Sequence, residues 1–358
     1  MNGRPDGAAQ EAARTVEMMR RMREVEELIL ARAPENDIGP SLDRIRAVME
    51  LAGDPQHSYP VIHLTGTNGK TSTSRMVDSI LRESGLSTGR FTSPHLHDIR
   101  ERITLSGKPI PREKFIAAYD EVAPLIDLVD ARSLESGGRR MNFFEVLVAV
   151  AFAAFADAPV DVAVVEVGLG GFWDATNVAD GQVAVITPVD LDHTHLLGDD
   201  VEEIAAEKSG IIKTDALAVS GVQDPLAAEV LRARAEEVGA RIVFEGNDFG
   251  VLAREVALGG QQVSLRGLAG EYPDLFLPLH GAHQASNLVT AVAAVEAFLG
   301  GGTQPLEHDI LLAATAAMTS PGRLEIVRRS PTVLVDAAHN PAGARSLVAA
   351  LEEAFAFT

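Results

Sequence analysis

The chain has 358 residues, of which 46% are hydrophobic, and its 31 basic against 51 acidic side chains give a formal charge of −20. This length allows roughly two domains with a sizeable core, and the negative charge argues against nonspecific nucleic-acid binding. The chain lacks cysteine, which excludes disulfides, a thiolate nucleophile and cysteine metal sites; it also shows no apolar signal segment and no run of the ~18 apolar residues that a membrane span needs, so we expect a cytoplasmic protein.

The N-terminal part of the chain predicts a tail followed by two helices. Residues 1–15 are polar and rich in glycine and alanine, so we expect a disordered tail. Apolar side chains at helical spacing predict one amphipathic helix over 16–32 and a second from about 41 to 51. Both helices are expected to pack on the core.

Residues 61–72 have the order strand, glycine loop, Lys-Thr, helix. Gly66 and Gly69 let backbone N–H groups approach phosphate oxygens, and the helix N-terminus adds partial positive charge. Lys70 is expected to meet the β- and γ-phosphates, and the hydroxyl of Thr71 or Ser72 to reach a phosphate or a magnesium ion. The position of this loop between a buried strand and a helix favours a nucleotide-binding site over an ordinary turn.

The next segments predict an exposed loop and two helices. Pro94 disfavours the helical conformation at Ser93, so the Ser93 hydroxyl is expected on an extended loop. Helices are predicted over 113–129 and 142–156, with a mobile connection over 131–140. The second helix is strongly apolar but contains Glu145, which is expected to be paired or functional because burying an unpaired charge is costly.

Two predicted strands end in loops that carry candidate metal ligands. Residues 162–165 form a continuous apolar run typical of a parallel sheet, and Glu166 follows at its end. Residues 183–186 predict another strand, followed by His193 and His195. Ligands of open α/β sheets bind at the carboxyl ends of strands, so we expect metal ligands at Glu166 and His193 and a bystander at His195. By position alone, Lys208 near a helix end reads as a surface charge.

The last part of the chain predicts βαβ units over 216–244, antiparallel strands over 251–279, and helices to about 298 and over 310–318. A linker-like break at 319–325 precedes one strand and one helix. These few elements cannot close a core of their own. We therefore expect an ATP-binding domain over 16–318 and the beginning of an incomplete C-terminal domain over 319–358.

Taken in order, the motifs resemble folylpolyglutamate synthase/dihydrofolate synthase, within the Mur ligase superfamily. The matching segments are residues 66–72, 92–96, 101–103, 143–145, 166–171, 174–177, 192–193, 197–198, 207–213, 283–287, 321–325 and 336–341. The resemblance implies an α/β fold, with a P-loop domain whose mostly parallel sheet is flanked by helices, and then the start of a smaller Rossmann-like domain that carries part of the glutamate ligase site.

The resemblance also implies an enzyme of folate biosynthesis and one-carbon metabolism. Such a ligase uses ATP to convert a carboxylate into an acyl phosphate, which the amine of L-glutamate then attacks. Dihydropteroate would give dihydrofolate, and the γ-carboxylate of a folate would extend a polyglutamate tail. The implied partners are these small molecules alone, without nucleic acid or membrane, and the implied state is a monomer.

Individual roles follow from the same resemblance. The nucleotide would be bound by Thr67, Asn68, Gly69, Lys70, Thr71, Ser72, Asn287, Arg323 and Asp336. Magnesium would be ligated by Ser93, Glu166 and His193, an oxygen-rich set that suits a hard cation, and a second divalent or monovalent cation is compatible with the family. The catalytic set would be Lys70, a carbamylated Lys208 and His339. The pterin-bearing substrate would lie near Asn142, Phe143, Phe144 and Trp173, where aromatic faces can stack on a flat ring.

One residue departs from the family pattern, and three alternatives stay open. Phe172 stands where the family has an arginine, which predicts the loss of one polar contact near the substrate. A cell-wall Mur ligase would place a long nucleotide-sugar domain before the phosphate loop, whereas about sixty residues precede it here. A P-loop kinase or GTPase would need recognition motifs that the sequence lacks. An inactive nucleotide-binding fragment is the third alternative.

Overall fold

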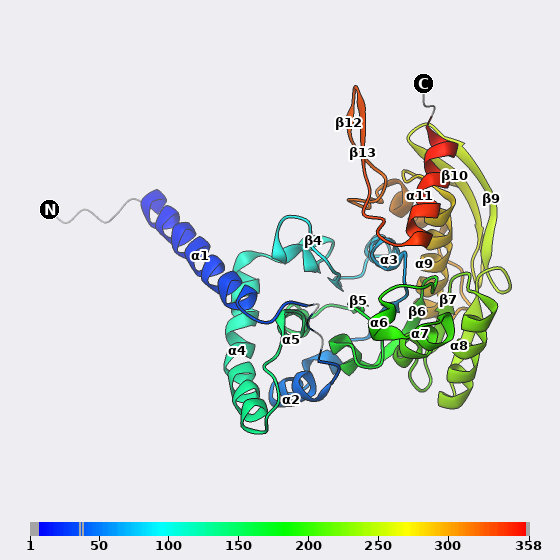
Figure 1. Cartoon of the computed structure of the whole chain (residues 1–358). Helices are drawn as coiled ribbons and strands as arrows, with labels where there is room; N and C mark the ends of the chain where they lie inside the picture. Colours follow the sequence, from blue (N-terminus) through cyan, green and yellow to red (C-terminus); the bar gives the residue numbers. More distant parts are fainter. Residues whose placement is uncertain (1–6, 36, 38, 356–358) are drawn as a thin grey trace.

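The computed structural model describes residues 7–35, 37 and 39–355 (Figure 1). An eight-stranded sheet has the strand order β4-β3-β2-β5-β1-β6-β7-β8. Its strands are β1 Val61–Thr65, β2 Thr88–Phe91, β3 Ile103–Leu105, β4 Lys108–Pro109, β5 Val162–Glu166, β6 Gly181–Ile186, β7 Leu217–Ser220 and β8 Arg241–Phe244. The strands from β2 to β8 in this order are parallel, and β3 and β4 add an antiparallel edge. The predicted mostly parallel sheet is confirmed.

Helices cover both faces of this sheet. One face is covered by α3 Lys70–Glu83, α9 Ala282–Gly300 and α10 His308–Ala316. The other face carries two groups of helices: α1 Gly7–Leu30, α2 Asp43–Leu51, α4 Arg112–Glu135 and α5 Phe143–Asp157 in one, and α6 Thr194–Leu197, α7 Val201–Lys208 and α8 Pro225–Val238 in the other (Figure 1). Along β1, Val61 faces the first of these groups while Ile62 and Leu64 face α3 and α9, as the two-residue period of a strand requires. Burial on both faces explains why the central strands are continuously apolar.

Smaller elements complete the described chain. Short 3-10 turns lie at Pro55–His57, Ile99–Arg102, Ala175–Val178 and Ser209–Ile211. The strands β9 Gly250–Ala257, β10 Gly260–Arg266 and β11 Glu271–Leu277 form an antiparallel sheet, as predicted. A hairpin of β12 Glu325–Arg329 and β13 Thr332–Val335 precedes α11 Pro341–Ala354. The division of the chain at residue 319 stays a prediction.

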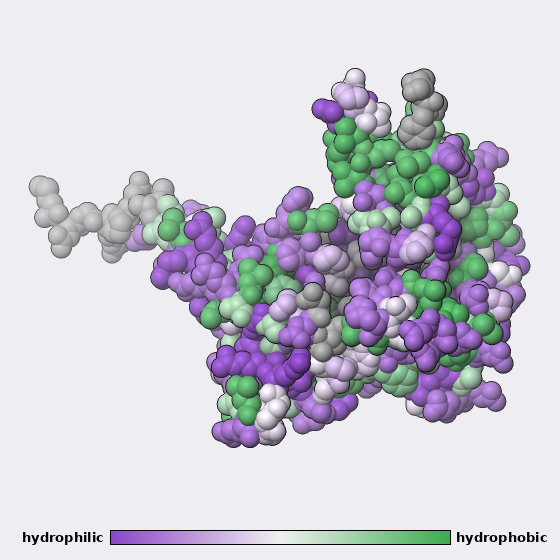
Figure 2. Space-filling model, viewed as in Figure 1, coloured by the Kyte–Doolittle hydropathy of each residue, from purple (hydrophilic) through white to green (hydrophobic). Residues whose placement is uncertain are grey.

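The hairpin projects from the rest of the molecule (Figure 1). Apolar side chains gather on it and on α11 in Figure 2, with Val327, Val335 and Val348 exposed. Elsewhere on this face polar side chains predominate. Within the described ranges, no helix is long and apolar enough to cross a bilayer.

Two expectations about local structure are wrong in part. Helix α1 begins at Gly7, so residues 7–15 are helical, while residues 1–6 lie outside the described part of the chain. Alanine has the highest helix propensity of any residue type, so the alanines of this stretch favour a helix over disorder. Helix α4 extends to Glu135, which leaves only the second half of the segment 131–140 as a connection.

Candidate active site

A cavity of about 580 Å³ lies at the carboxyl ends of β5, β1 and β6, which are neighbours in the sheet. It opens where the two helix groups on one face of the sheet meet, because its lining includes Asn142 before α5 and Lys208 at the end of α7. Most residues predicted for the site line this cavity: Thr67, Asn68, Gly69, Lys70, Thr71, Ser72, Ser93, Asn142, Phe144, Glu166, Trp173, His193, Lys208, Arg323 and His339. Phe143, Asn287 and Asp336 do not line it.

The loop between β1 and α3 requires glycine at two positions. Gly66 has φ +145°, and a Cβ there would lie 1.9 Å from Thr187 Oγ1. Gly69 has φ +91°, and a Cβ there would lie 2.5 Å from Asn287 Oδ1, so Asn287 packs behind the loop. Lys70 Nζ donates to Gly66 O at 2.8 Å across the loop. The backbone is therefore shaped for anion binding at the N-terminus of α3.

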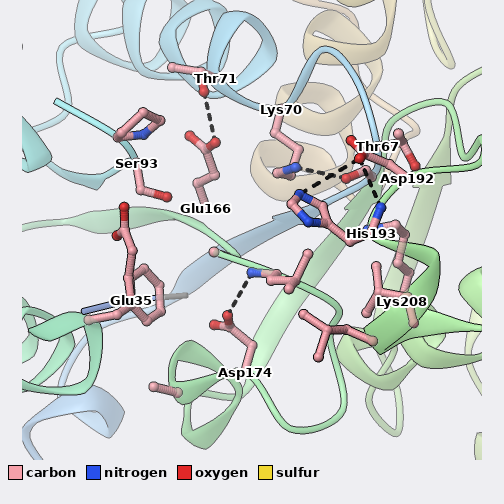
Figure 3. A pocket seen from close by; sticks show the side chains of 18 of the residues that line it. Glu35, Thr67, Lys70, Thr71, Ser93, Glu166, Asp174, Asp192, His193 and Lys208 are labelled. Carbon is pink, nitrogen blue, oxygen red and sulfur yellow. Dashed lines mark hydrogen bonds and ion pairs between the residues drawn. The ribbon is translucent and has the colours of Figure 1, made fainter. Parts of the chain in front are cut away.

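Glu166 is a buried carboxylate, and one of its oxygens has no hydrogen-bond partner among the described residues. Thr71 Oγ1 donates to its Oε1 at 2.7 Å, whereas Oε2 has no hydrogen-bond partner among the described residues. Burial raises the pKa of Glu166 to about 7, although the charges of Lys70 and Arg323 oppose this. Figure 3 shows Ser93 and Glu166 side by side on one side of the cavity, with Lys70, Asp192 and His193 grouped on the other. A buried acceptor without a partner is costly unless a ligand satisfies it.

Lys208 is buried, with 2% of its surface exposed, so its reading as a surface charge is wrong. The tertiary packing of α7 on the sheet decides this, and local sequence carries no sign of it. Burial lowers the pKa of Lys208 to about 7, and the nearby charge of Lys70 adds to the effect. The preceding residue, Glu207, accepts from the backbone N–H groups of Gly171 at 3.2 Å and Trp173 at 3.3 Å. It thereby fixes the loop after β5, which contains Gly168, Gly170 and Gly171, against α7.

His193 and His339 face a common carboxylate, Asp192. His339 Nε2 lies 3.6 Å from Asp192 Oδ2, and His193 Nε2 lies 3.8 Å from Oδ1. Burial favours the neutral form of Asp192, but a hydrogen bond from Asn340 and the charges of the two histidines outweigh it and lower its pKa. Among the described residues, no three histidine and acidic side chains converge as a ready metal site. The predicted set of Ser93, Glu166 and His193 shares one cavity without forming such a cluster.

Asp336, a predicted nucleotide residue that does not line the cavity, supports it from behind. Asp336 accepts from the N–H groups of Leu324 and Ala338, both at 2.7 Å, and so shapes the turns next to Arg323 and His339. Ser72 directs its hydroxyl to Ser320 Oγ at 2.8 Å, which ties the helix start to the segment before Arg323.

The aromatic end of the cavity is built on the start of α5. Asn142 and Glu145 exchange hydrogen bonds in a capping box. Arg44 Nε lies 3.1 Å from Glu145 Oε1. Glu145 was expected to be paired or functional, and it is paired. Phe144 lines the cavity, whereas Phe143 packs under the Arg102 guanidinium, 5.0 Å from its ring. Phe143 faces away because residues adjacent in a helix point in different directions.

Phe172, the departure from the family pattern, does not line the cavity. Its ring lies 5.0 Å from the guanidinium of Arg234 in α8, and it packs against Gly210. The side chain at this position therefore makes a structural contact outside the site.

Four acidic residues of the cavity were absent from the predicted set of site residues: Glu35, Glu145, Asp174 and Asp192. Asp174 accepts from Leu169 N at 3.0 Å and from Thr176 N at 2.9 Å; its segment 174–177 was among the matched motifs and offered a signal. Asp192 could also have been predicted from the sequence, because it lies next to His193. Glu35 lies in the connection between α1 and α2, where sequence offered none, and it is held by Arg102 at 2.7 Å.

Comparisons with known proteins agree on one group of enzymes. Residues 131–295 match the model of the Mur ligase middle domain. The chain is 52% identical to the dihydrofolate synthase/folylpolyglutamate synthase of Mycobacterium tuberculosis, over 99% of this chain and 75% of the relative.

Solved structures give the same result. The fold matches the Mycobacterium tuberculosis folylpolyglutamate synthase complexed with ADP and AMPPCP with a TM-score of 0.89, over 95% of this chain and 75% of that one. It also matches an FPGS–AMPPCP–folate complex that is 33% identical, with a TM-score of 0.87, over 94% of this chain and 81% of that one.

Proposed function

The chain belongs to the dihydrofolate synthase/folylpolyglutamate synthase family, and from this membership we propose how its cavity works. The enzyme is an ATP-dependent glutamate ligase. We propose that it joins L-glutamate to dihydropteroate, to the γ-carboxylate of a folate, or to both. The identity to folate ligases over nearly the whole chain favours this reaction over that of a cell-wall Mur ligase.

One observation carries the proposal. The phosphate loop, the buried Lys208 and the buried Glu166, whose Oε2 has no hydrogen-bond partner, line the same cavity at the strand ends. The loop N–H groups would bind the ATP phosphates, and Lys70 would exchange its bond to Gly66 O for a phosphate oxygen. Lys70 and Arg323 would then neutralise charge as the γ-phosphoryl group passes to the substrate carboxylate. ADP leaves, the glutamate amine attacks the acyl carbon, and the acyl–oxygen bond to phosphate breaks.

A magnesium ion fits the residues present. Ser93, Glu166 and His193 would hold it, and the unpartnered Glu166 Oε2 is the acceptor that a hard cation requires. When bound, such an ion neutralises phosphate charge. Because burial raises the pKa of Glu166 to about 7, the deprotonated fraction of this side chain increases as the pH rises toward and above 7. The deprotonated carboxylate is the form that binds a metal ion.

Lys208 suits carbamylation, since the neutral amine is the form that reacts with carbon dioxide. Its pKa of about 7 leaves a large neutral fraction at physiological pH. Carbamylation would replace a cation near Lys70 with an anion. The substrate ring would lie against Phe144 and Trp173, with Asn142 at the same end of the cavity.

Three further points of the proposal do not rest on the cavity. They are action in the cytoplasm, a monomeric enzyme, and small-molecule partners without nucleic acid. The charge of −20 supports the last point, and sedimentation of the purified chain would test the second.

The deciding experiment supplies ATP, magnesium, L-glutamate and either dihydropteroate or a reduced folate, and follows phosphate release together with product mass. Glutamate-dependent amide identifies the substrate. Lys70→Met serves as the inactive control, and Lys114→Met, an exposed lysine of α4, as the matched control. Phosphate release without amide would contradict glutamate transfer, and the absence of ATP binding would overturn the phosphate-loop assignment.

A further inference from the structure

The segment that carries Arg323 and His339 is joined to the phosphate loop by the side chain of Asn340. Asn340 is 7% exposed and caps the N-terminus of α11, where its Oδ1 accepts from Gly343 N at 2.8 Å. The same amide exchanges two hydrogen bonds with the amide of Asn68, at 3.2 and 3.1 Å. Its second N–H donates to Asp192 Oδ2 at 2.9 Å. Both donors and both acceptor sites of this amide are therefore used.

The two partners of Asn340 are parts of the reaction site. Asn68 lies in the phosphate loop between the two required glycines, and its side chain borders the cavity. Asp192 also borders the cavity, faces His339 and His193, and is close enough to Lys70 and Lys208 to act on their charges. A single buried amide thus contacts both the loop that meets phosphate and the carboxylate beside the cationic groups.

A second connection runs in parallel between the same three segments. Arg345, one turn into α11, contacts Asp190 Oδ2 at 3.2 Å. The backbone of Asp190 in turn exchanges hydrogen bonds with Thr67 Oγ1, at 2.9 and 3.0 Å. Arg345 is exposed, so its ion pair is worth little. Asn340 is the buried member of the pair and the one able to fix orientation.

We infer that Asn340 is a positioning residue of the nucleotide site, which holds Asn68 and Asp192 in the orientation that ATP requires. Without it, the Asn68 side chain is free to turn into the phosphate site, and Asp192 loses the hydrogen bond that Asn340 donates to its Oδ2. The expected consequence is weaker nucleotide binding rather than loss of the helix cap. This inference rests on the proposed function for its ligand, MgATP.

The test uses two substitutions that keep the helix cap. Asparagine, aspartate and serine are about equally good N-cap residues, so Asn340→Ser and Asn340→Asp leave the α11 start intact. Asn340→Ser removes the contacts with Asn68 and Asp192, and we expect about tenfold weaker MgATP binding by calorimetry. Asn340→Asp also places a carboxylate against Asp192, so we expect the larger loss. Thermal unfolding should be nearly the same for the wild type and Asn340→Ser, whereas Asn340→Asp should melt at a lower temperature because it buries a second carboxylate beside Asp192.

A double-mutant cycle separates positioning from folding. In an Asn68→Ser background, the effect of Asn340→Ser on the MgATP dissociation constant should shrink, because the shared hydrogen bonds are already lost. Equal MgATP binding by the wild type and both cap-preserving variants would overturn the inference and leave the proposed function intact. In Asn340→Ser, a loss of binding that only follows a lower melting temperature would also overturn it. Failure of the wild type to bind MgATP would instead contradict the proposed function.

Discussion

The two ends of the cavity treat buried charge in opposite ways. At the strand-end wall, Glu166 and Lys208 are buried and Lys70 is half-buried, and these charged groups have few or no polar partners. At the helix wall each carboxylate is paired with an arginine: the buried Glu145 with Arg44, and the exposed Glu35 with Arg102. Unpaired buried charge is costly and is kept where a ligand will meet it. We therefore propose that the helix wall is a scaffold and that the strand-end wall carries the reaction.

The largest expected effect breaks the pairing at the helix wall. Arg44→Ala leaves Glu145 buried without its cation, which costs about 3–5 kcal/mol in the free energy of unfolding for such buried pairs. Urea denaturation measures this cost, and MgATP affinity should change little. Arg46→Ala, an exposed arginine in the same helix, should be nearly neutral. A loss of ATP affinity in Arg44→Ala without a loss of stability would contradict the division between the walls.

The opposite outcome is expected at the strand-end wall. Lys70→Met should lower kcat/KM of the ligase by about 10²–10³-fold, since it removes a preorganised charge from the transition state. Its melting temperature should stay equal or rise, because a half-buried cation is replaced by an apolar side chain of similar length. Retained activity, or a fall in stability as large as that of Arg44→Ala, would contradict this expectation.

A pH-dependent test sharpens the contrast at Lys208. Its pKa in the folded protein is about 7, and the ordinary lysine value is 10.5. Between these values the unfolded chain binds a proton that the folded chain does not, so stability rises with pH by about 1.4 kcal/mol per unit. The Lys208→Met variant lacks this pH-dependent contribution to the free energy of unfolding. In buffer free of carbon dioxide, it should be more stable than the wild type at pH 7, and the difference should shrink toward pH 9. A constant difference would show that Lys208 is not a buried amine.

The smallest effect concerns the contact between Ser72 and Ser320. Ser320→Ala removes one buried hydrogen bond, worth about 1 kcal/mol, and should raise KM for ATP a few-fold through Arg323 with little change in kcat. Ser330→Ala, an exposed serine of the hairpin, is the matched control. An unchanged KM would show that this contact does not position the arginine.

Local sequence was a good guide wherever contiguous residues define both structure and chemistry. The phosphate loop, the strands that flank it and the antiparallel segment follow from periodicity and glycine placement, because these depend on neighbours in the chain. The disorder predicted for residues 7–15 was wrong, because the alanines there have a high helix propensity and the segment is helical.

The sequence alone determined the fold class, the phosphate loop with Lys70, and the location of Glu166 and His193 at strand ends, because these follow from short-range pattern. Only the tertiary structure decided the burial of Lys208, the exclusion of Phe143 from the cavity and the contacts of Asn340 with Asn68 and Asp192. Asn340 and Asn68 are 272 residues apart in the chain. Such contacts depend on which elements pack together, and the burial that perturbs a pKa arises only once they do.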